Sequence, residues 1–168
     1  QDQWWNAGIF REVYLYNTAL VYIADVFARA ELDDKYEDGV LRLMLTGGFA
    51  TPSVTGWKFA VQLFDAGGNK VPGTGTEVEL PCGCGDVSCH PANTGNRAVL
   101  TLPVRRPCQW NAEAPYLYTL TVTLLAPDGH QVEFTSCRVG FRRIEIADRK
   151  LLINGKAVRI NGVNRHEH

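Results

Sequence analysis

The sequence predicts an all-β protein, an antiparallel β-sandwich, and three observations support this prediction. Apolar residues alternate with polar ones along much of the chain, as in the run of Trp57, Phe59, Val61 and Leu63. No segment sustains a helical repeat with recognisable caps. Turn-forming stretches such as "DAGGNKVPG" and "APDGHQ" separate the alternating runs. One apolar and one polar face in each strand is typical of half-buried antiparallel sheets.

Further segments alternate in the same way; they contain Leu41, Leu43 and Leu45; Thr76, Val78 and Leu80; Ala98, Leu100 and Leu102; and Tyr118, Leu120, Val122 and Leu124. About seven strands are expected between residues 18 and 142, the number typical of an immunoglobulin-like sandwich. The pair Asp128-Gly129 predicts a tight turn between the last two. The stretch "YIADVFARAELDD" (22–34) comes nearest to a helical pattern, yet it fits a long, bulged strand at least as well.

The pattern changes after residue 142. Asn154-Gly155 lies between two apolar runs and predicts a C-terminal hairpin. The segment that follows, "AVRINGVN" (157–164), has the pattern of a strand buried on both faces, which is typical of parallel sheets covered by helices. The chain has no initiator methionine and stops at "RHEH". We therefore expect a piece of a longer protein with three parts: residues 1–17, 18–142 and 143–168.

Composition excludes some functions. The net charge of −1 gives no field that would attract nucleic acid or an anionic membrane surface. No apolar run approaches the roughly 20 residues that span a bilayer. The five cysteines are an odd number with uneven spacing, which favours reduced thiols over a disulfide framework.

Three segments resemble glycoside hydrolase family 2, most closely its large bacterial β-galactosidases. "QDQWWNAGIFREVYL" is similar to the end of the family's jelly-roll domain, and "WNAEAPYLYTLTV" to a strand of its sandwich domain. "GFRRIEIADRKLLINGKAVRINGVNRHEH" resembles the junction where the sandwich leads into the catalytic (β/α)₈ barrel. The resemblance implies that residues 1–17 end a sugar-binding jelly roll, residues 18–142 form the sandwich, and residues 143–168 are a linker hairpin and the first barrel strand.

The resemblance also implies a function. The longer protein would be a retaining hydrolase of terminal β-D-galactosides such as lactose, and it would use sodium and magnesium ions. Asp2 would hold a sugar hydroxyl and the sodium ion, and His166 would bind a galactose hydroxyl. The acid/base and nucleophile glutamates lie downstream in the family, so this chain would be an inactive, non-catalytic linker domain. Glu167 matches neither of them.

Partners and location follow from the same resemblance. We expect the neighbouring jelly roll and barrel as partners, a β-galactoside as the substrate of the longer protein, and no nucleic acid or membrane. That protein would be a homo-oligomer in the cytoplasm, with the periplasm as the alternative. A different class of function stays open, a stand-alone carbohydrate-binding or interaction sandwich.

The stretch "CGCGDVSCH" is a second candidate site. Cys82, Cys84, Cys89 and His90 offer four ligands of types that zinc accepts, but their spacing matches no common zinc motif. A plain loop with free thiols, a disulfide and a zinc site are the three interpretations. His166 and His168 could also share an ion on an extended strand. Around the "WNAEAPYLY" stretch, Trp110, Pro115 and Tyr118 are expected to stabilise the sandwich edge.

Overall fold

The computed structural model describes residues 8, 11–50, 55–81 and 96–164. Within them the chain contains ten strands and no α-helix. The strands are β1 (Val21–Leu32), β2 (Gly39–Phe49), β3 (Lys58–Phe64), β4 (Thr76–Glu79), β5 (Arg97–Val104), β6 (Tyr118–Leu125), β7 (Gln131–Val139), β8 (Ile144–Ala147), β9 (Lys150–Ile153) and β10 (Lys156–Ala157).

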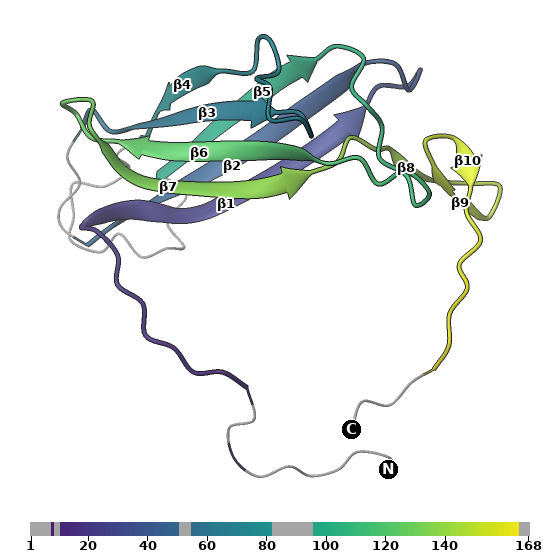
Figure 1. Cartoon of the computed structure of the whole chain (residues 1–168), viewed down its shortest axis with the longest axis horizontal. Helices are drawn as coiled ribbons and strands as arrows, with labels where there is room; N and C mark the ends of the chain where they lie inside the picture. The colour runs from purple at the N-terminus through teal and green to yellow at the C-terminus, as the bar shows by residue number, and fades with distance from the viewer. Residues whose placement is uncertain (1–7, 9–10, 51–54, 82–95, 165–168) are drawn as a thin grey trace.

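The first seven strands form two facing antiparallel sheets (Figure 1). One sheet has the order β1-β2-β5 and the other the order β4-β3-β6-β7. The chain passes from one sheet to the other between β2 and β3, between β4 and β5, and between β5 and β6. Two antiparallel sheets connected in this way are typical of immunoglobulin-like sandwiches. The predicted fold class is confirmed.

The core lies between the two sheets and consists of the residues that the alternation predicted to point inward. Leu41, Leu43 and Leu45 of β2 are almost completely buried, and so are the inward residues of β3 and β6. Burying each such side chain stabilises the fold by about 1.5–3 kcal/mol. The largest fully buried side chains outside β2 are Phe59, Leu63, Leu80, Leu120, Val122, Leu124 and Phe141.

The segment with an ambiguous pattern is a strand. Residues 21–32 form β1, and its register against β2 shifts between Ile23 and Asp25. An extra residue in one strand of a pair is a β-bulge, and it interrupts strict alternation in the sequence. The bulged-strand interpretation is therefore correct, and the helical one is not.

Two tight turns form where the sequence predicted them. Gly129 has φ +87° and connects β6 to β7. Asn154 and Gly155 both have positive φ, 51° and 74°, and connect β9 to β10. Two successive left-handed residues are typical of the hairpin turn that Asn-Gly favours. Strands β8, β9 and β10 form a separate three-stranded sheet at one end of the sandwich (Figure 1).

Residues 157–164, expected to be the first barrel strand of a longer protein, do not form a strand here beyond Ala157. Only Lys156 and Ala157 pair with β9, and residues 158–164 have no regular structure. Ile160 and Val163 are 75% and 91% exposed. A strand needs neighbours for its backbone groups. Among the described residues, the backbone bond of this segment beyond Ala157 joins Val158 N–H to the Leu151 carbonyl at 2.9 Å. The backbone bonds that join this end of the chain to β9 therefore reach as far as Val158.

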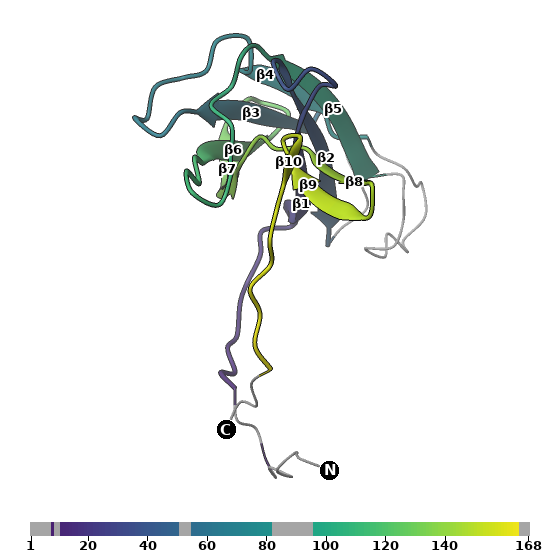
Figure 2. The same ribbon diagram turned by 90° about the vertical axis from the view of Figure 1, so that its right-hand side faces the viewer.

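Two extended segments leave the sandwich on the same side, the side of β1. Residues 11–20 precede β1, residues 158–164 follow β10, and both run away from the sheets (Figures 1 and 2). Apolar residues of the first segment are more than 60% exposed: Val13, Tyr14, Leu15, Tyr16 and Leu20. Such a concentration of exposed apolar groups is uncommon on a monomer surface.

Candidate functional site at the sandwich–hairpin junction

The sugar-binding candidates Asp2 and His166 lie outside the residues that the structure describes. So do Cys82, Cys84, Cys89 and His90, and so does His168. Their roles remain predictions. In the part of the chain that is described, no group of three or more His, Cys, Asp or Glu residues could hold a metal ion.

The two described cysteines do not form a disulfide. Cys108 is exposed and Cys137 is half-buried, and both are free thiols. Burial raises the pKa of the Cys137 thiol, which makes it less reactive at neutral pH. Among the described residues there is also no helix with the length and apolar character needed to cross a membrane.

Tyr118 is a structural residue, as predicted. Its hydroxyl accepts a hydrogen bond of 2.8 Å from the backbone N–H of Cys108, ten positions upstream. The ring meets Phe141 edge to face, with 5.3 Å between the ring centroids. Burial raises the pKa of Tyr118 to about 12. A tyrosine whose hydroxyl bonds back to the upstream backbone is a corner that stabilises immunoglobulin-like sandwiches.

Trp110 covers the end of the sandwich beside this corner. Its backbone N–H donates to the carbonyl of Phe141 at 2.8 Å, and the Arg142 guanidinium lies 4.6 Å from its ring centroid. A Cβ atom on Gly140 would come within 2.9 Å of the Trp110 side chain. Glycine is therefore needed for this close approach. The expected structural role of Trp110 is confirmed.

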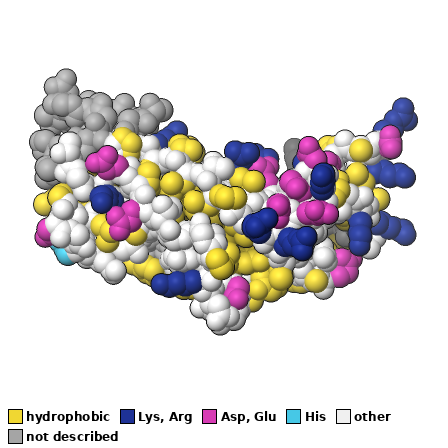
Figure 3. Space-filling view, turned by 90° about the horizontal axis from the view of Figure 1, so that it is seen from above, with side chains coloured by type: hydrophobic (Ala, Val, Ile, Leu, Met, Phe, Trp, Pro, Cys, Tyr) yellow, Lys and Arg dark blue, Asp and Glu magenta, His cyan; other side chains and the backbone are white. Residues whose placement is uncertain are grey.

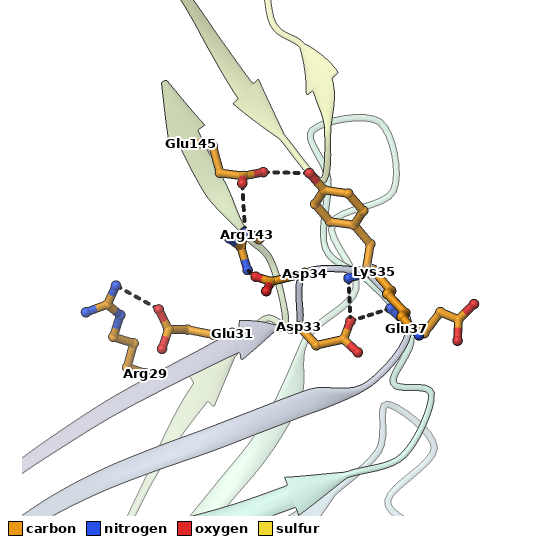
Figure 4. A network of polar contacts seen from close by, with 9 residues as sticks. Arg29, Glu31, Asp33, Asp34, Lys35, Glu37, Arg143 and Glu145 are labelled. Carbon is orange, nitrogen blue, oxygen red and sulfur yellow. Dashed lines mark hydrogen bonds and ion pairs between the residues drawn. The ribbon is translucent and has the colours of Figure 1, made fainter. Parts of the chain in front are cut away.

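Six residues at this end of the sandwich hold the β8–β10 sheet in place, and we call them the anchor cluster. They are Asp34, Tyr36, Trp110, Arg143, Glu145 and Asn154. Tyr36 donates to a carboxylate oxygen of Glu145 at 2.7 Å. The Arg143 guanidinium bonds the other oxygen of Glu145 at 2.9 Å and also pairs with Asp34 (Figure 4). Hydrogen bonds to charged partners are stronger than those between neutral groups.

The pKa values of the cluster follow from these bonds. The Tyr36 hydroxyl, and then the Arg143 guanidinium, lower the pKa of Glu145. The same bond to Glu145 raises the pKa of Tyr36. Bonds to Glu145 and Asp34 raise the pKa of Arg143. Each group is thus held in the protonation state that the cluster needs at neutral pH.

Asn154 fixes the hairpin turn to the same place. Its side-chain oxygen accepts from the Arg143 N–H at 2.9 Å, and its own N–H donates to the Arg143 carbonyl at 2.9 Å. Its side-chain amide donates to the Trp110 carbonyl at 3.1 Å. Gly155 lies against the Tyr36 ring, where a Cβ atom would be 3.1 Å away. The turn is thereby bonded to two separate parts of the chain.

The loop between β1 and β2 presents Tyr36 in a fixed orientation. Asp33 accepts hydrogen bonds from the N–H groups of Lys35 at 3.2 Å and Glu37 at 2.8 Å. The bond from Glu37 is the main reason why the pKa of Asp33 is lowered. Tyr36 has φ 57°, a left-handed conformation that is uncommon for a tyrosine. Gln109 donates to the Tyr36 carbonyl at 2.5 Å and supports this conformation.

Sequence reasoning did not identify the anchor cluster. Tyr36 and Glu145 are 109 positions apart, and no local pattern connects them. Charge alone gives no indication either, because Lys, Arg, Asp and Glu side chains mix over this end of the molecule (Figure 3). The Asn154-Gly155 turn and the nearby "GFRR" stretch indicate only a hairpin and a family resemblance.

By its fold, the described chain is an immunoglobulin-like sandwich domain with an anchored hairpin. The family model for glycosyl hydrolases family 2 matches residues 21–142. The chain belongs to this family. Solved structures support the fold: a β-glucuronidase of Parabacteroides merdae matches with a TM-score of 0.67 and 21% identity, over 88% of this chain and 17% of that one.

Curated relatives cover the whole chain. The β-galactosidase of Vibrio cholerae serotype O1 is 38% identical over all of this chain and 16% of its own length. The β-galactosidase of Priestia megaterium is 37% identical over 99% of this chain and 15% of its own. The chain therefore spans about a sixth of the length of these relatives.

Proposed function

We propose that this chain is the non-catalytic connecting domain of a longer β-galactosidase, which hydrolyses terminal β-D-galactosides such as lactose with retention. The similarity to β-galactosidases along the whole chain supports the activity of the longer protein. The small share of those relatives that it spans supports the presence of further domains.

The anchor cluster is the observation that carries the connecting role. It bonds the turn at Asn154 and the strand at Glu145 to the loops that end the sandwich. An isolated two-stranded hairpin is marginally stable in water. Here the β8–β10 sheet is attached to the sandwich by hydrogen bonds between charged groups, so the direction in which the chain leaves the sandwich is fixed. A domain that follows would keep a defined orientation.

The two extended segments support the same role. Leu15 is fully exposed, and Val163 is 91% exposed. Apolar groups of this kind are normally covered. Because both segments leave on the β1 side, domains attached to them would lie next to each other (Figure 2). We propose the jelly roll and the catalytic barrel of the family as these domains.

The finer assignments are proposals for the longer protein. Asp2 would hold a sugar hydroxyl and a sodium ion, and His166 would bind a galactose hydroxyl. A carboxylate is a suitable ligand for a hard cation and an acceptor for hydroxyl groups. The longer protein would also need magnesium, would form a homo-oligomer and would reside in the cytoplasm.

The connecting role can be tested by NMR relaxation on the 168-residue chain. The amides of residues 144–157 should have heteronuclear NOE values equal to those of the sandwich strands. Arg143→Gln removes the pairs with Glu145 and Asp34 and should make these amides more mobile. Arg149→Gln, which replaces an exposed arginine in the turn between β8 and β9, is the control and should change nothing.

Two results would contradict the proposal. The hairpin of the unmodified chain could move independently of the sandwich, which would leave the exit direction undefined. Alternatively, lactose could produce saturable shifts in the sandwich amides, which would identify a carbohydrate-binding module instead.

A further inference from the structure

A groove of about 540 Å³ lies between β1 and β7, near the start of β8. These two strands are edges of their sheets, and they lie on the side from which the extended segments leave (Figure 1). The groove is lined by backbone and side chains of β1 and β7 and of the segment that enters β8, and its charged lining residues are Arg29, Glu31, Arg138, Arg142, Arg143 and Glu145.

The groove has an excess of positive charge. Four arginines and two glutamates line it, which leaves a formal charge of +2. Arg29 pairs with Glu31, with 2.7 Å between nitrogen and oxygen, and the other oxygen of this carboxylate pairs with Arg42 at 3.3 Å. Arg143 is neutralised by Glu145. The two remaining arginines, Arg138 and Arg142, carry the excess.

These two arginines are positioned but not neutralised. The Arg142 guanidinium lies on the Trp110 ring, and Arg138 donates to the Leu117 carbonyl at 3.4 Å. Neither forms an ion pair with a carboxylate of the described residues. A guanidinium stacked on an aromatic ring keeps its edge free to bind a carboxylate with two parallel hydrogen bonds.

The lining indicates the kind of partner. No aromatic residue is among the lining residues, whereas sugar and cofactor pockets are rich in apolar and aromatic groups. One wall is β1, an edge strand whose outward backbone groups face no neighbouring strand of its sheet, although the carbonyl of Ala30 accepts a hydrogen bond from Arg142 N–H at 3.5 Å. Edge strands bind extended peptides through such backbone groups.

We propose that this groove binds an extended, acidic polypeptide segment, whose carboxylates pair with Arg138 and Arg142. That a partner segment lies on the β1 side rests on the proposed connecting function. That this segment is acidic rests only on the unpaired arginines of the groove. The two arginines would fix the orientation of this acidic segment, because a positively charged segment in the groove would be repelled.

Fluorescence anisotropy with a labelled hexaglutamate peptide tests the proposal on the 168-residue chain. The peptide should bind at low ionic strength, and hexalysine should not. The double variant Arg138→Gln/Arg142→Gln should weaken binding about tenfold. Arg105→Gln removes an exposed arginine that does not line the groove, and it should change binding less than about twofold.

A second variant keeps the test independent of folding. Glu31→Gln removes the carboxylate that pairs with Arg29 and Arg42, and it should tighten binding by about threefold. Circular dichroism confirms that each variant keeps its strands. Equal losses in the double variant and in Arg105→Gln, or no binding by the unmodified chain, would overturn the proposal. Neither result would affect the connecting role, which depends on the mobility of residues 144–157.

Discussion

At the scale of single residues, a few polar side chains complete the hydrogen bonding of buried backbone. Thr74 is fully buried, and its hydroxyl donates to the Val71 carbonyl at 2.7 Å and accepts from Leu63 N–H at 3.3 Å. Tyr118 is the acceptor for the N–H of Cys108 in a part-buried bond. A buried backbone group without a partner costs free energy. These side chains therefore stabilise loops that the sheets alone do not reach.

Replacing Tyr118 by phenylalanine tests this role. The substitution keeps the ring contacts and removes only the acceptor for Cys108 N–H. We expect the free energy of unfolding to fall by about 1–3 kcal/mol in urea titrations. Tyr14→Phe, in the exposed segment before β1, is the matched control and should change it by less than about 0.5 kcal/mol. Equal stability of both variants would disprove the corner.

At the scale of elements, the sequence predicts what local pattern determines. Alternation identified the strands around Leu43 and Val122, and the turn residues identified the hairpins at Gly129 and Gly155. Residues 157–164 were predicted to be a strand because their apolar content suits a buried sheet. That sheet requires neighbours that no described segment provides, so all of these residues except the half-buried Val158 are exposed.

The anchor cluster could not be predicted, because it depends on contacts between distant parts of the chain and not on local pattern. Its members, such as Asp34 and Glu145, come from loops and strands far apart in the chain. Trp110 and Asn154 are conspicuous in the sequence for other reasons, and the other four members resemble ordinary surface residues in their own sequence neighbourhoods. Only the folded sandwich brings the β1–β2 loop next to β8, and pairing of this kind leaves no local pattern.

Asn154→Ala should release the hairpin turn. Alanine cannot replace the bonds to Arg143 N–H and the Trp110 carbonyl, and it is disfavoured at the φ of 51° found here. We expect hydrogen exchange in β8 and β9 to accelerate by about tenfold or more, while β6 is unaffected. Asn154→Gly tolerates the φ, so it should show an intermediate effect. Unchanged exchange in β9 would show that the side chain is not needed.

The attachment of the hairpin should depend on pH. The pKa of Glu145 is lowered from 4.5, so its contribution is complete above 4.5 and is lost as the pH falls through the lowered value. The pKa of Tyr36 is raised from 10.0, so its contribution is complete below 10.0 and is lost as the pH rises through the raised value. Amide shifts of residues 144–157 should be constant between these limits. In Glu145→Gln the acidic transition should disappear, and its persistence would assign it to another group.

At the scale of the whole molecule, the anchor cluster and the exposed apolar segments differ in whether they have partners within the described chain. The anchor cluster is satisfied internally, whereas Leu15 and Ile160 have nothing to cover them in the described structure. A sandwich with its own core can fold alone, but these segments favour contact with further chain. This arrangement suits a domain placed between two others.

The cysteine-rich stretch of residues 82–90 should not contribute a structural metal. If Cys82, Cys84, Cys89 and His90 held zinc, the ion would stabilise the folded state by mass action. We expect EDTA to leave the melting temperature unchanged and elemental analysis to find no zinc. A fall of several degrees together with bound zinc in the untreated protein would favour the metal interpretation instead.

The isolated chain should not hydrolyse galactosides. A retaining glycosidase needs two carboxyl groups about 5 Å apart, one of them with a raised pKa so that it can donate a proton. The glutamates of the described groove, Glu31 and Glu145, are both paired with arginines, and the pKa of Glu145 is lowered. Such a carboxylate is a poor proton donor at neutral pH. A chromogenic β-galactoside should therefore be released no faster than by a heat-treated control. Saturable turnover that Glu145→Gln abolishes would place a catalytic acid on this domain and contradict the non-catalytic connecting role that we propose.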